Sequence, residues 1–228
     1  MLLNEFERTL QFDKEILNPV NTFYSGSNMR NKNSDRFRYE RDYWDRKLTI
    51  DLKKIGWVRA GKGAFSEVFT NPTKDFVLKI TKKPDRAFAW FALMTQLYPN
   101  KHFPKISNAK IYNINGINYH IFLIEKLIPV KKTPFISTLG RIADRFIYRK
   151  SNVLDNNFYV NNCNIKSKSV QQVIQYLKEN PSFEKALYIL RNNENVRTKI
   201  LPDIHSKNIM QRTDGTLVLT DPVYNGFD

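Results

Sequence analysis

The chain has 228 residues, of which 41% are hydrophobic, including 16 Phe and 11 Tyr. This apolar content suffices for one large domain or two small lobes and excludes an intrinsically disordered tail. The formal net charge of +15 predicts attraction to acidic partners, which include nucleotides, nucleic acids, anionic membranes and acidic proteins, but does not choose among them.

Cysteine and histidine are scarce in this chain. Cys163 is the single cysteine, which excludes an internal disulfide and a thiolate metal site. Three His argue against a histidine-based zinc centre. No apolar run reaches the length of a membrane span, and the start MLLNEFERTLQF lacks the basic and apolar blocks of a secretory signal. We therefore expect a cytoplasmic protein with no membrane association.

The first part of the chain, residues 1–54, is expected to be a helical and basic extension. Leu3, Phe6 and Leu10 recur at helical spacing within residues 1–17. A polar stretch at 21–36 is typical of a linker, and residues 36–54 mix charges with aromatic side chains as in a solvated helix.

Strand patterns dominate residues 55–128. The segment 55–80 predicts three strands separated by a glycine turn and an Asn-Pro turn. Residues 85–98 are apolar nearly all round and predict a buried helix. Two further strands are expected around Asn115-Gly116, a strong hairpin signal. Together these elements predict a five-stranded antiparallel lobe with one helix.

Helical patterns dominate residues 129–228. We expect a helix over 134–149 with Arg141, Arg145 and Arg149 at four-residue spacing. A second helix should begin at a capping box formed by Ser169 and Gln172, and a third should follow Pro181. The end of the chain predicts a hairpin of strands 208–212 and 216–220 around Asp214-Gly215. The fold class is therefore α+β, with a strand lobe followed by a reduced, mostly helical lobe.

The run GKGAFSEVF, residues 61–69, is the first candidate site. Gly61 and Gly63 allow the backbone to approach phosphate oxygens closely, Phe65 would cap the phosphates, and Val68 would pack against a purine. Such glycine turns also occur in ordinary hairpins. Here the run precedes Lys79 on the next predicted strand, which favours lysine binding to nucleotide phosphates over a role as an edge-strand solubility residue.

Polar residues near the C-terminus form the second candidate site. Asn208 follows Asp203 by five positions, and Asp221 follows Asn208 by thirteen. The Asp-Gly hairpin between them should return Asp221 to the side of Asn208, so that two oxygen ligands converge as in a magnesium site. Asp203 would then be free to accept a proton from a substrate hydroxyl. Taken singly, each residue could equally punctuate a turn; their joint spacing favours the site.

These motifs resemble a known family. The segments GxGxFSxV, VLK, DxHxxN and the second aspartate resemble the protein-kinase superfamily in order and spacing. The pair DIHSKNIM and LTDPV is similar to the early serine/threonine protein kinases of Teseptimavirus-type phages. The resemblance covers about residues 55–228 and implies a two-lobed protein-kinase-like fold, with an N-lobe over 55–128 and a truncated C-lobe over 129–228.

The resemblance also implies a function. The enzyme would be made early in phage infection and would transfer the ATP γ-phosphate to host proteins in the bacterial cytoplasm, among them transcription, RNA-processing or defence proteins. ATP and Mg²⁺ would be its cofactors. Asp203 would be the base, and Asn208 and Asp221 would bind Mg²⁺. The other implied site residues are Lys79, His205 and Lys207 for catalysis and phosphate charge, Gly61, Gly63, Phe65, Ser66 and Val68 over the nucleotide, and Glu125 and Leu127 at the adenine.

Several positions depart from the family pattern. Leu201-Pro202 replaces the usual His-Arg before the base, and Pro222-Val223 replaces Phe-Gly. The helix 85–98 contains no glutamate to pair with Lys79, and Asp85 is a poorly placed substitute. The chain has seven residues after Asp221, so we expect substrate proteins to be recognised by the basic helix 134–150 or the first 50 residues.

Two alternative functions remain open at this point. His205 follows the predicted base by two positions, as in the D-x-H-x-x-N of aminoglycoside and choline kinases, which favours a small-molecule phosphotransferase. The missing glutamate and the short C-lobe favour a pseudokinase that binds and inhibits a host protein. Direct nucleic-acid binding is compatible with the charge but is not the interpretation that we favour.

Overall fold

The structure is a computed structural model that describes residues 52–63, 66–81, 85–107, 110–114, 117–148, 159, 163–192 and 200–225. Its contacts divide the chain into two compact units. The first comprises Met1–Pro84 and Ser107–Lys126, and the second comprises Asp85–Ile106 and Leu127–Asp228. The helices expected within 1–17 and 36–54 lie outside the described residues, apart from the last few positions of the second.

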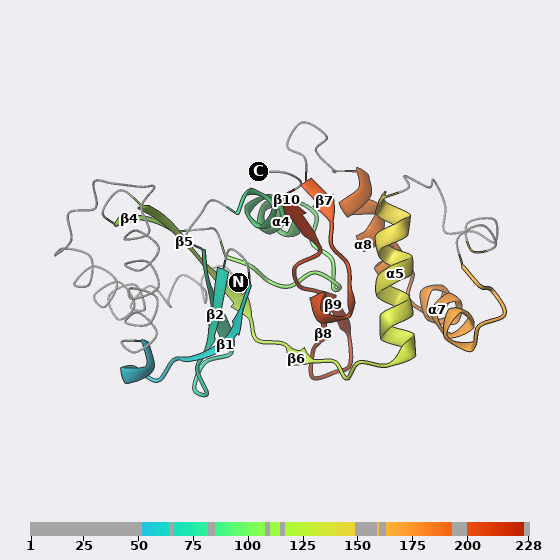
Figure 1. The fold of residues 1–228 in the computed structure, drawn as a ribbon, viewed down its shortest axis with the longest axis horizontal. Helices are drawn as coiled ribbons and strands as arrows, with labels where there is room; N and C mark the ends of the chain where they lie inside the picture. The colour runs from blue at the N-terminus through green and yellow to red at the C-terminus, as the bar shows by residue number, and fades with distance from the viewer. Residues whose placement is uncertain are drawn as a thin grey trace, which may run out of the picture. The chain divides into compact units, whose positions relative to one another are not determined.

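A five-stranded antiparallel sheet forms the first unit (Figure 1). Its strands are β1 (Val58–Lys62), β2 (Ser66–Thr70), β3 (Phe76–Thr81), β4 (Lys110–Ile114) and β5 (Ile117–Glu125), in the spatial order β1-β2-β3-β5-β4. All neighbouring strands run antiparallel. The predicted α+β class and strand lobe are therefore confirmed. The Asn115-Gly116 turn itself lies outside the described residues, although the strands on either side of it pair as expected.

Buried apolar side chains and one polar turn explain this sheet. Phe69 and Leu78 face each other across β2 and β3 and are fully buried, and Trp57 packs its ring 5.9 Å from that of Phe76. The predicted Asn-Pro turn is closed by the side chain of Asn71, which accepts hydrogen bonds from the backbone N–H and the hydroxyl of Thr73. The local turn chemistry and the pattern of burial thus agree on the same hairpin.

Four helices lie in the described part of the second unit: α4 (Arg86–Leu97), α5 (Pro134–Tyr148), α7 (Lys168–Glu179) and α8 (Pro181–Asn192). Helix α5 contacts both α7 and α8 (Figure 1). The ring of Phe146 on α5 meets that of Tyr188 on α8 edge to face at 5.1 Å. The predicted helices 134–149 and that after Pro181 are confirmed, and Pro181 opens its helix at a position where the missing N–H has no cost.

Helix α4 differs from the prediction in its burial. Asp85 caps its N-terminus by accepting a hydrogen bond from the N–H of Phe88 at 3.0 Å. Phe88 and Phe91 are buried, but Leu93 and Leu97 are 51% and 60% exposed. The expectation of a helix buried all round is therefore wrong, because apolar composition alone does not say which faces find a partner. The contact-based division also places α4 in the second unit rather than with the sheet.

The capping box predicted for α7 is also wrong. The helix begins one residue earlier, at Lys168, and Ser169 lies inside its first turn. The hydroxyl of Ser169 accepts a hydrogen bond from Thr138 on α5 at 3.0 Å and lies 3.0 Å from the hydroxyl of Ser167. The hydroxyl of Ser169 is thus bonded to another helix and does not make the cap of its own helix that the sequence pattern predicted.

Short strands complete the second unit. Strands β6 (Ile128–Pro129), β8 (Ile209–Gln211) and β9 (Leu217–Leu219) form one antiparallel sheet, and β7 (Ile200–Pro202) pairs with β10 (Val223–Asn225). Gly215 has a φ of 84°, and Asp214 accepts a hydrogen bond from the N–H of Thr216. The Asp-Gly hairpin is therefore confirmed, with glycine at the position that needs the left-handed conformation. No described helix is long and apolar enough to cross a membrane.

His102 anchors the β8–β9 hairpin to α8. It is 1% exposed, its Nδ1 lies 2.6 Å from the carbonyl oxygen of Leu217, and its Nε2 lies 3.0 Å from the hydroxyl of Ser182. A carbonyl oxygen only accepts, so neutral His102 carries its proton on Nδ1 and accepts from Ser182 at Nε2. Burial lowers the pKa of His102, while the carbonyl of Leu217 opposes that shift.

We expect His102 to make folding stability fall on acidification. Because the pKa is lower in the folded than in the unfolded chain, the unfolded chain gains its proton first as pH falls below 6.5. The free energy of unfolding should drop by at most about 1.4 kcal/mol for each pH unit below about 6.5, until the folded protein also binds the proton. Urea unfolding of wild type and His102→Gln at several pH values measures this, with His205→Gln, an exposed histidine, as the control. An identical pH dependence in wild type and His102→Gln would contradict the assignment.

Candidate functional site

Asp203, Asn208 and Asp221 are brought together at the ends of two antiparallel strand pairs. The loop 203–208 connects β7 to β8 and ends in a 3-10 turn, Ser206–Asn208. Because β7 pairs with β10 and β8 pairs with β9, the chain between β9 and β10 passes beside this loop. The N–H of Asp203 donates to the carbonyl of Pro222 at 2.8 Å, and the N–H of Thr220 donates to that of Asn208 at 2.9 Å.

The side chain of Asn208 joins the other two residues directly. Its Nδ2 donates to the carbonyl oxygens of Asp203 and Asp221, each at 2.7 Å, and lies 3.4 Å from Oδ2 of Asp203. With the NH₂ end bound to two carbonyls, the amide orientation is fixed and Oδ1 is left as an acceptor. The hairpin therefore returns Asp221 to the side of Asn208, as the spacing predicted.

Asp203 presents its carboxylate to solvent beside a histidine. The side chains of Asp203 and His205 are 44% and 49% exposed, and Oδ1 of Asp203 lies 3.7 Å from Nε2 of His205. Nδ1 of His205 accepts a hydrogen bond from the N–H of Lys207 at 3.2 Å. In the neutral ring the proton is then on Nε2, the nitrogen that faces Asp203. Lys207 itself is exposed.

The donor set at this place fits Mg²⁺. Asn208 Oδ1 and the carboxylate of Asp221 are hard oxygen ligands, and the backbone atoms of both residues are held by the bonds described above. In the described part of the chain, no group of three or more His, Cys, Asp or Glu could hold a metal ion. Mg²⁺ needs only a few protein ligands when nucleotide phosphates and water occupy its other coordination positions.

In the first unit, strand register places Val68 and Lys79 on one face of the sheet. Val68 lies opposite Lys79, which lies opposite Phe122, and directly paired residues share a face. Lys79 is 3% exposed and Phe122 is 1% exposed. The solubility interpretation of Lys79 is therefore wrong, because the side chain lies within the protein.

Glu67 is a buried acid that the sequence analysis did not consider. It is 5% exposed, its Oε1 has no hydrogen-bond partner among the described residues, and the exposed Lys62 approaches it to 3.8 Å. Since Glu67 lies opposite Ile80, it occupies the face of the sheet opposite to that of Lys79. It does not replace the glutamate that the predicted helix lacks.

The glycine run occupies the β1–β2 hairpin. Gly61 and Gly63 are exposed, and the N–H of Gly63 donates to the carbonyl of Ser66, the first residue of β2, at 2.8 Å. The register of β1 shifts between Arg59 and Gly61, as at a β-bulge. Phe65 lies outside the described residues. A Cβ built on Gly61 would meet no atom of the described residues within 4 Å, so this part of the fold does not require glycine there.

We expect Gly61→Ala to separate nucleotide binding from stability. The added methyl group meets no neighbouring atom in the described structure, so stability should change by less than about 0.5 kcal/mol. If phosphates approach this backbone, ATP affinity should fall several-fold. Gly215→Ala is the matched control: its φ of 84° should cost about 1–2 kcal/mol of stability. Thermal unfolding and titration with a fluorescent ATP analogue measure the two effects, and unchanged affinity in Gly61→Ala would count against a nucleotide at this loop.

The predicted adenine-binding residues lie where the chain leaves the first unit and enters the second: Glu125 belongs to the first and Leu127 to the second. Glu125 is the last residue of β5 and pairs with Phe76. The N–H of Lys126 donates to the carbonyl of Asp75 at 2.8 Å, and Leu127 is the first residue of the second unit's longer segment. The structure thus places these backbone groups at the passage of the chain between units.

The described part of helix α5 carries two of the three predicted arginines. Arg141 is exposed and Arg145 is half-buried, and both guanidinium groups lie near Cys163, whose pKa they lower while burial, the larger effect, raises it. Arg149 lies outside the described residues. A raised pKa lowers the fraction of Cys163 that is thiolate at neutral pH.

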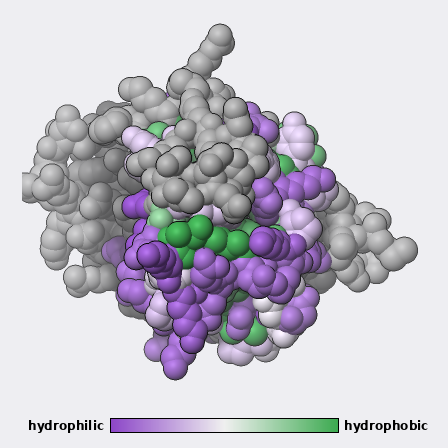
Figure 2. All heavy atoms as spheres, turned by 90° about the vertical axis from the view of Figure 1, so that its right-hand side faces the viewer, coloured by the Kyte–Doolittle hydropathy of each residue, from purple (hydrophilic) through white to green (hydrophobic). Residues whose placement is uncertain are grey.

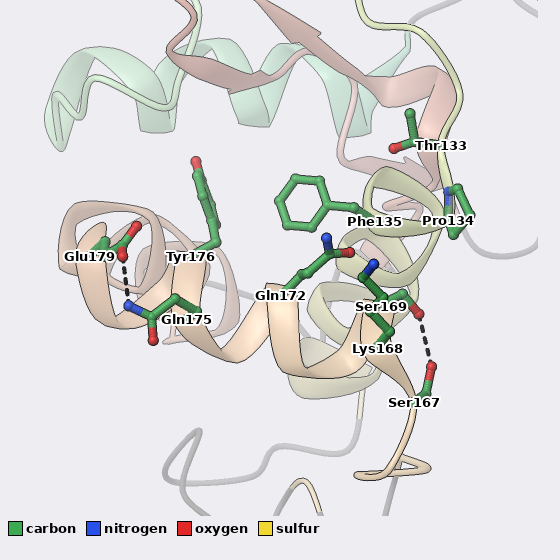
Figure 3. A pocket seen from close by; sticks show the side chains of 10 residues that line it. All are labelled: Thr133, Pro134, Phe135, Ser167, Lys168, Ser169, Gln172, Gln175, Tyr176 and Glu179. Carbon is green, nitrogen blue, oxygen red and sulfur yellow. Dashed lines mark hydrogen bonds between the residues drawn. The ribbon is translucent and has the colours of Figure 1, made fainter.

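An open groove lies between the N-terminal end of α5 and the length of α7. Figure 3 shows Phe135 from α5 and Tyr176 from α7 at its sides, with Ser167 and Ser169 at one end. Those two rings meet edge to face at 5.6 Å. None of the predicted site residues lines this groove. The surface seen in Figure 2 is mostly hydrophilic, with a small hydrophobic area beside the residues drawn in grey.

Comparison with known proteins gives a distant structural similarity. No protein family matches the sequence, and no curated protein matches it. Among solved structures, the chain is similar to the kinase PK-1 of Cydia pomonella granulovirus, with 14% sequence identity and a TM-score of 0.37. The alignment covers 78% of this chain and 57% of that kinase, so the chain spans little more than half of its length.

Proposed function

We propose that this protein is an ATP-dependent protein kinase that transfers the γ-phosphate to serine or threonine hydroxyls. The observation that carries the proposal is the side chain of Asn208, which holds Asp203 on one side and Asp221 on the other. A base and two metal-binding oxygens within one hydrogen-bonded cluster are the groups that phosphoryl transfer requires.

The residues of the second unit would act as follows. Asp203 accepts the proton of the substrate hydroxyl, since its carboxylate is accessible and its backbone is held on both sides. Asn208 and Asp221 would hold Mg²⁺, which when bound neutralises phosphate charge. Lys207, which is exposed beside the base, would face the transferred phosphate.

The residues of the first unit would hold the nucleotide. Lys79 would bind the α- and β-phosphates, and Val68, on the same face of the sheet, would pack against adenine. Gly61, Gly63 and Ser66 would cover the phosphates, and the backbone near Glu125 and Leu127 would bind the adenine edge. Catalysis then consists of positioning and charge neutralisation.

The substrates would be host proteins. On the resemblance of DIHSKNIM and LTDPV to early phage kinases, the enzyme would act in the cytoplasm of an infected bacterium, on transcription, RNA-processing or defence proteins. The net charge of +15 would favour encounter with acidic proteins.

One observation favours a second candidate, a small-molecule phosphotransferase. His205 lies 3.7 Å from the carboxylate of Asp203, where the protein-kinase pattern has lysine. Histidine at this position is the feature that this chain shares with aminoglycoside and choline kinases.

Labelling with γ-³²P-ATP separates the candidates. Purified protein is incubated with labelled ATP, Mg²⁺ and either a dialysed bacterial lysate or a mixture of aminoglycosides and choline. Labelled protein bands containing phosphoserine or phosphothreonine support the protein kinase. A labelled small molecule with unlabelled proteins supports the second candidate, and no transfer in either mixture overturns both.

A further inference from the structure

Helix α5 carries a carboxylate that the motif analysis did not identify. Oδ1 of Asp144 accepts a hydrogen bond at 3.1 Å from the N–H of Ile204, the residue directly after the predicted base. Asp144 precedes Ile204 by 60 positions and belongs to no motif in the sequence. Its side chain therefore acts across the fold, on the backbone of the loop that carries Asp203.

The peptide unit between Asp203 and Ile204 is held at both of its polar ends. Its N–H donates to Asp144, and its carbonyl oxygen accepts from Nδ2 of Asn208 at 2.7 Å. The N–H of Asp203 itself donates to Pro222 at 2.8 Å. The backbone on each side of the Asp203 Cα is thus fixed by hydrogen bonds, and this sets the direction of the Cα–Cβ bond that carries the carboxylate.

Gly140 allows the helix to approach that closely. A Cβ at this position would lie 3.2 Å from the backbone Cα and C of His205 and 3.3 Å from the carbonyl oxygen of Ile204. Gly140 and Asp144 are four residues apart, so they lie on the same face of α5 one turn from each other. The close contact at one turn allows the short side chain at the next to reach the loop.

The electrostatic surroundings of Asp144 agree with this placement. Burial raises its pKa, the N–H of Ile204 lowers it, the charge of Asp203 raises it and that of His205 lowers it. The charges of Asp203 and His205 therefore lie close enough to act on Asp144. Asp144 is half-buried, whereas the side chains of Asp203 and His205 are accessible to solvent.

We propose that Asp144 is a positioning residue, which together with Gly140 makes one face of α5 the support that orients the base Asp203. Asp144 bonds the backbone N–H of Ile204 and acts on the base through the Asp203–Ile204 peptide. The inference rests on the proposed phosphoryl-transfer function, but the stability of the loop conformation can be measured without an activity assay.

The experiment compares Asp144→Ala with Asp144→Asn, which keeps an oxygen acceptor for the N–H of Ile204. Asp144→Ala should lower kcat by about 100-fold, the cost of misplacing a reacting group by about 1 Å, and leave the KM for ATP unchanged. Asp144→Asn should recover most of kcat. Gly140→Ala should resemble Asp144→Ala, whereas Ser137→Ala, one turn earlier on the same helix, should behave as wild type.

Amide hydrogen exchange provides the readout that does not depend on activity. In Asp144→Ala and Gly140→Ala, exchange in the segment 203–209 should accelerate at least several-fold, while exchange in α8 stays at the wild-type rate. Asp144→Asn should retain protection. The positioning role is overturned if Asp144→Ala keeps both wild-type kcat and wild-type protection. It is also overturned if exchange in α8 accelerates as much as in 203–209 and the KM for ATP changes as much as kcat. If the variants show the expected exchange pattern but the wild-type protein transfers no phosphate, the proposed function is overturned and the support of the loop by α5 stays established.

Discussion

Replacing Asp203 by asparagine should lower the rate of phosphate transfer by about 10²- to 10⁴-fold, the usual contribution of a general base. The amide has nearly the shape of the carboxylate, and the bond to Pro222 and the 2.7 Å bond from Asn208 involve backbone atoms of residue 203. The amide oxygen of asparagine can also keep the longer contact with Nδ2 of Asn208, which is 3.4 Å in the wild type. The loop should therefore keep its conformation. Because the base is not proposed to bind phosphate, the affinity for Mg·ATP should stay within about threefold of wild type, well under 1 kcal/mol.

Single-turnover transfer and equilibrium titration with an ATP analogue measure these two quantities. His205→Gln is the matched control at a neighbouring exposed position. It changes a group that would orient Asp203 but would not itself accept the proton. It should reduce transfer far less than Asp203→Asn. Transfer at the wild-type rate in Asp203→Asn would remove Asp203 from the role of base.

Replacing Asp221 by asparagine should abolish most of the magnesium-dependent activity at ordinary Mg²⁺ concentrations. The carboxylate is the stronger of the two proposed metal ligands, and loss of metal-derived charge stabilisation is worth several kcal/mol, or a rate decrease of at least about 100-fold. The backbone carbonyl of residue 221, which accepts from Nδ2 of Asn208 at 2.7 Å, is retained, so the cluster should stay folded.

A magnesium titration of kcat tests this expectation. The apparent Mg²⁺ requirement should rise at least tenfold, a change of about 1.4 kcal/mol in metal affinity. Asp214→Asn, in the turn of the same hairpin, serves as the control, because its carboxylate caps Thr216 and lies outside the proposed metal site. Equal titration curves for Asp221→Asn and wild type would show that the hairpin does not hold the metal.

The parts of the fold that local chemistry determines were predictable from the sequence. Asp214-Gly215 specified the hairpin because glycine alone adopts its left-handed φ without strain, and that hairpin places Asp221 beside Asn208. The succession of strands along the chain from residue 58 to residue 125 followed from runs of strand-forming residues and the turn residues between them. The functional roles of these residues stay predictions.

Tertiary contacts explain what the sequence did not reveal. Ser169 carried a capping pattern, but its hydroxyl bonds Thr138 on another helix. Asp144 and Gly140 looked like ordinary helix positions, since the loop that they contact is distant in sequence. An i, i+4 pair of glycine and aspartate on a helix otherwise rich in buried apolar residues was the available signal, but it is too common to identify a site without coordinates.

The most direct test of the account is the transfer of γ-³²P from ATP to serine and threonine in host-lysate proteins, run side by side for wild type and Asp203→Asn. We predict Mg²⁺-dependent labelling by wild type that falls by at least about 100-fold in the variant. Equal labelling by the two proteins, or none by a folded wild-type protein that binds Mg·ATP, would contradict the assignment of this cluster as a phosphoryl-transfer site.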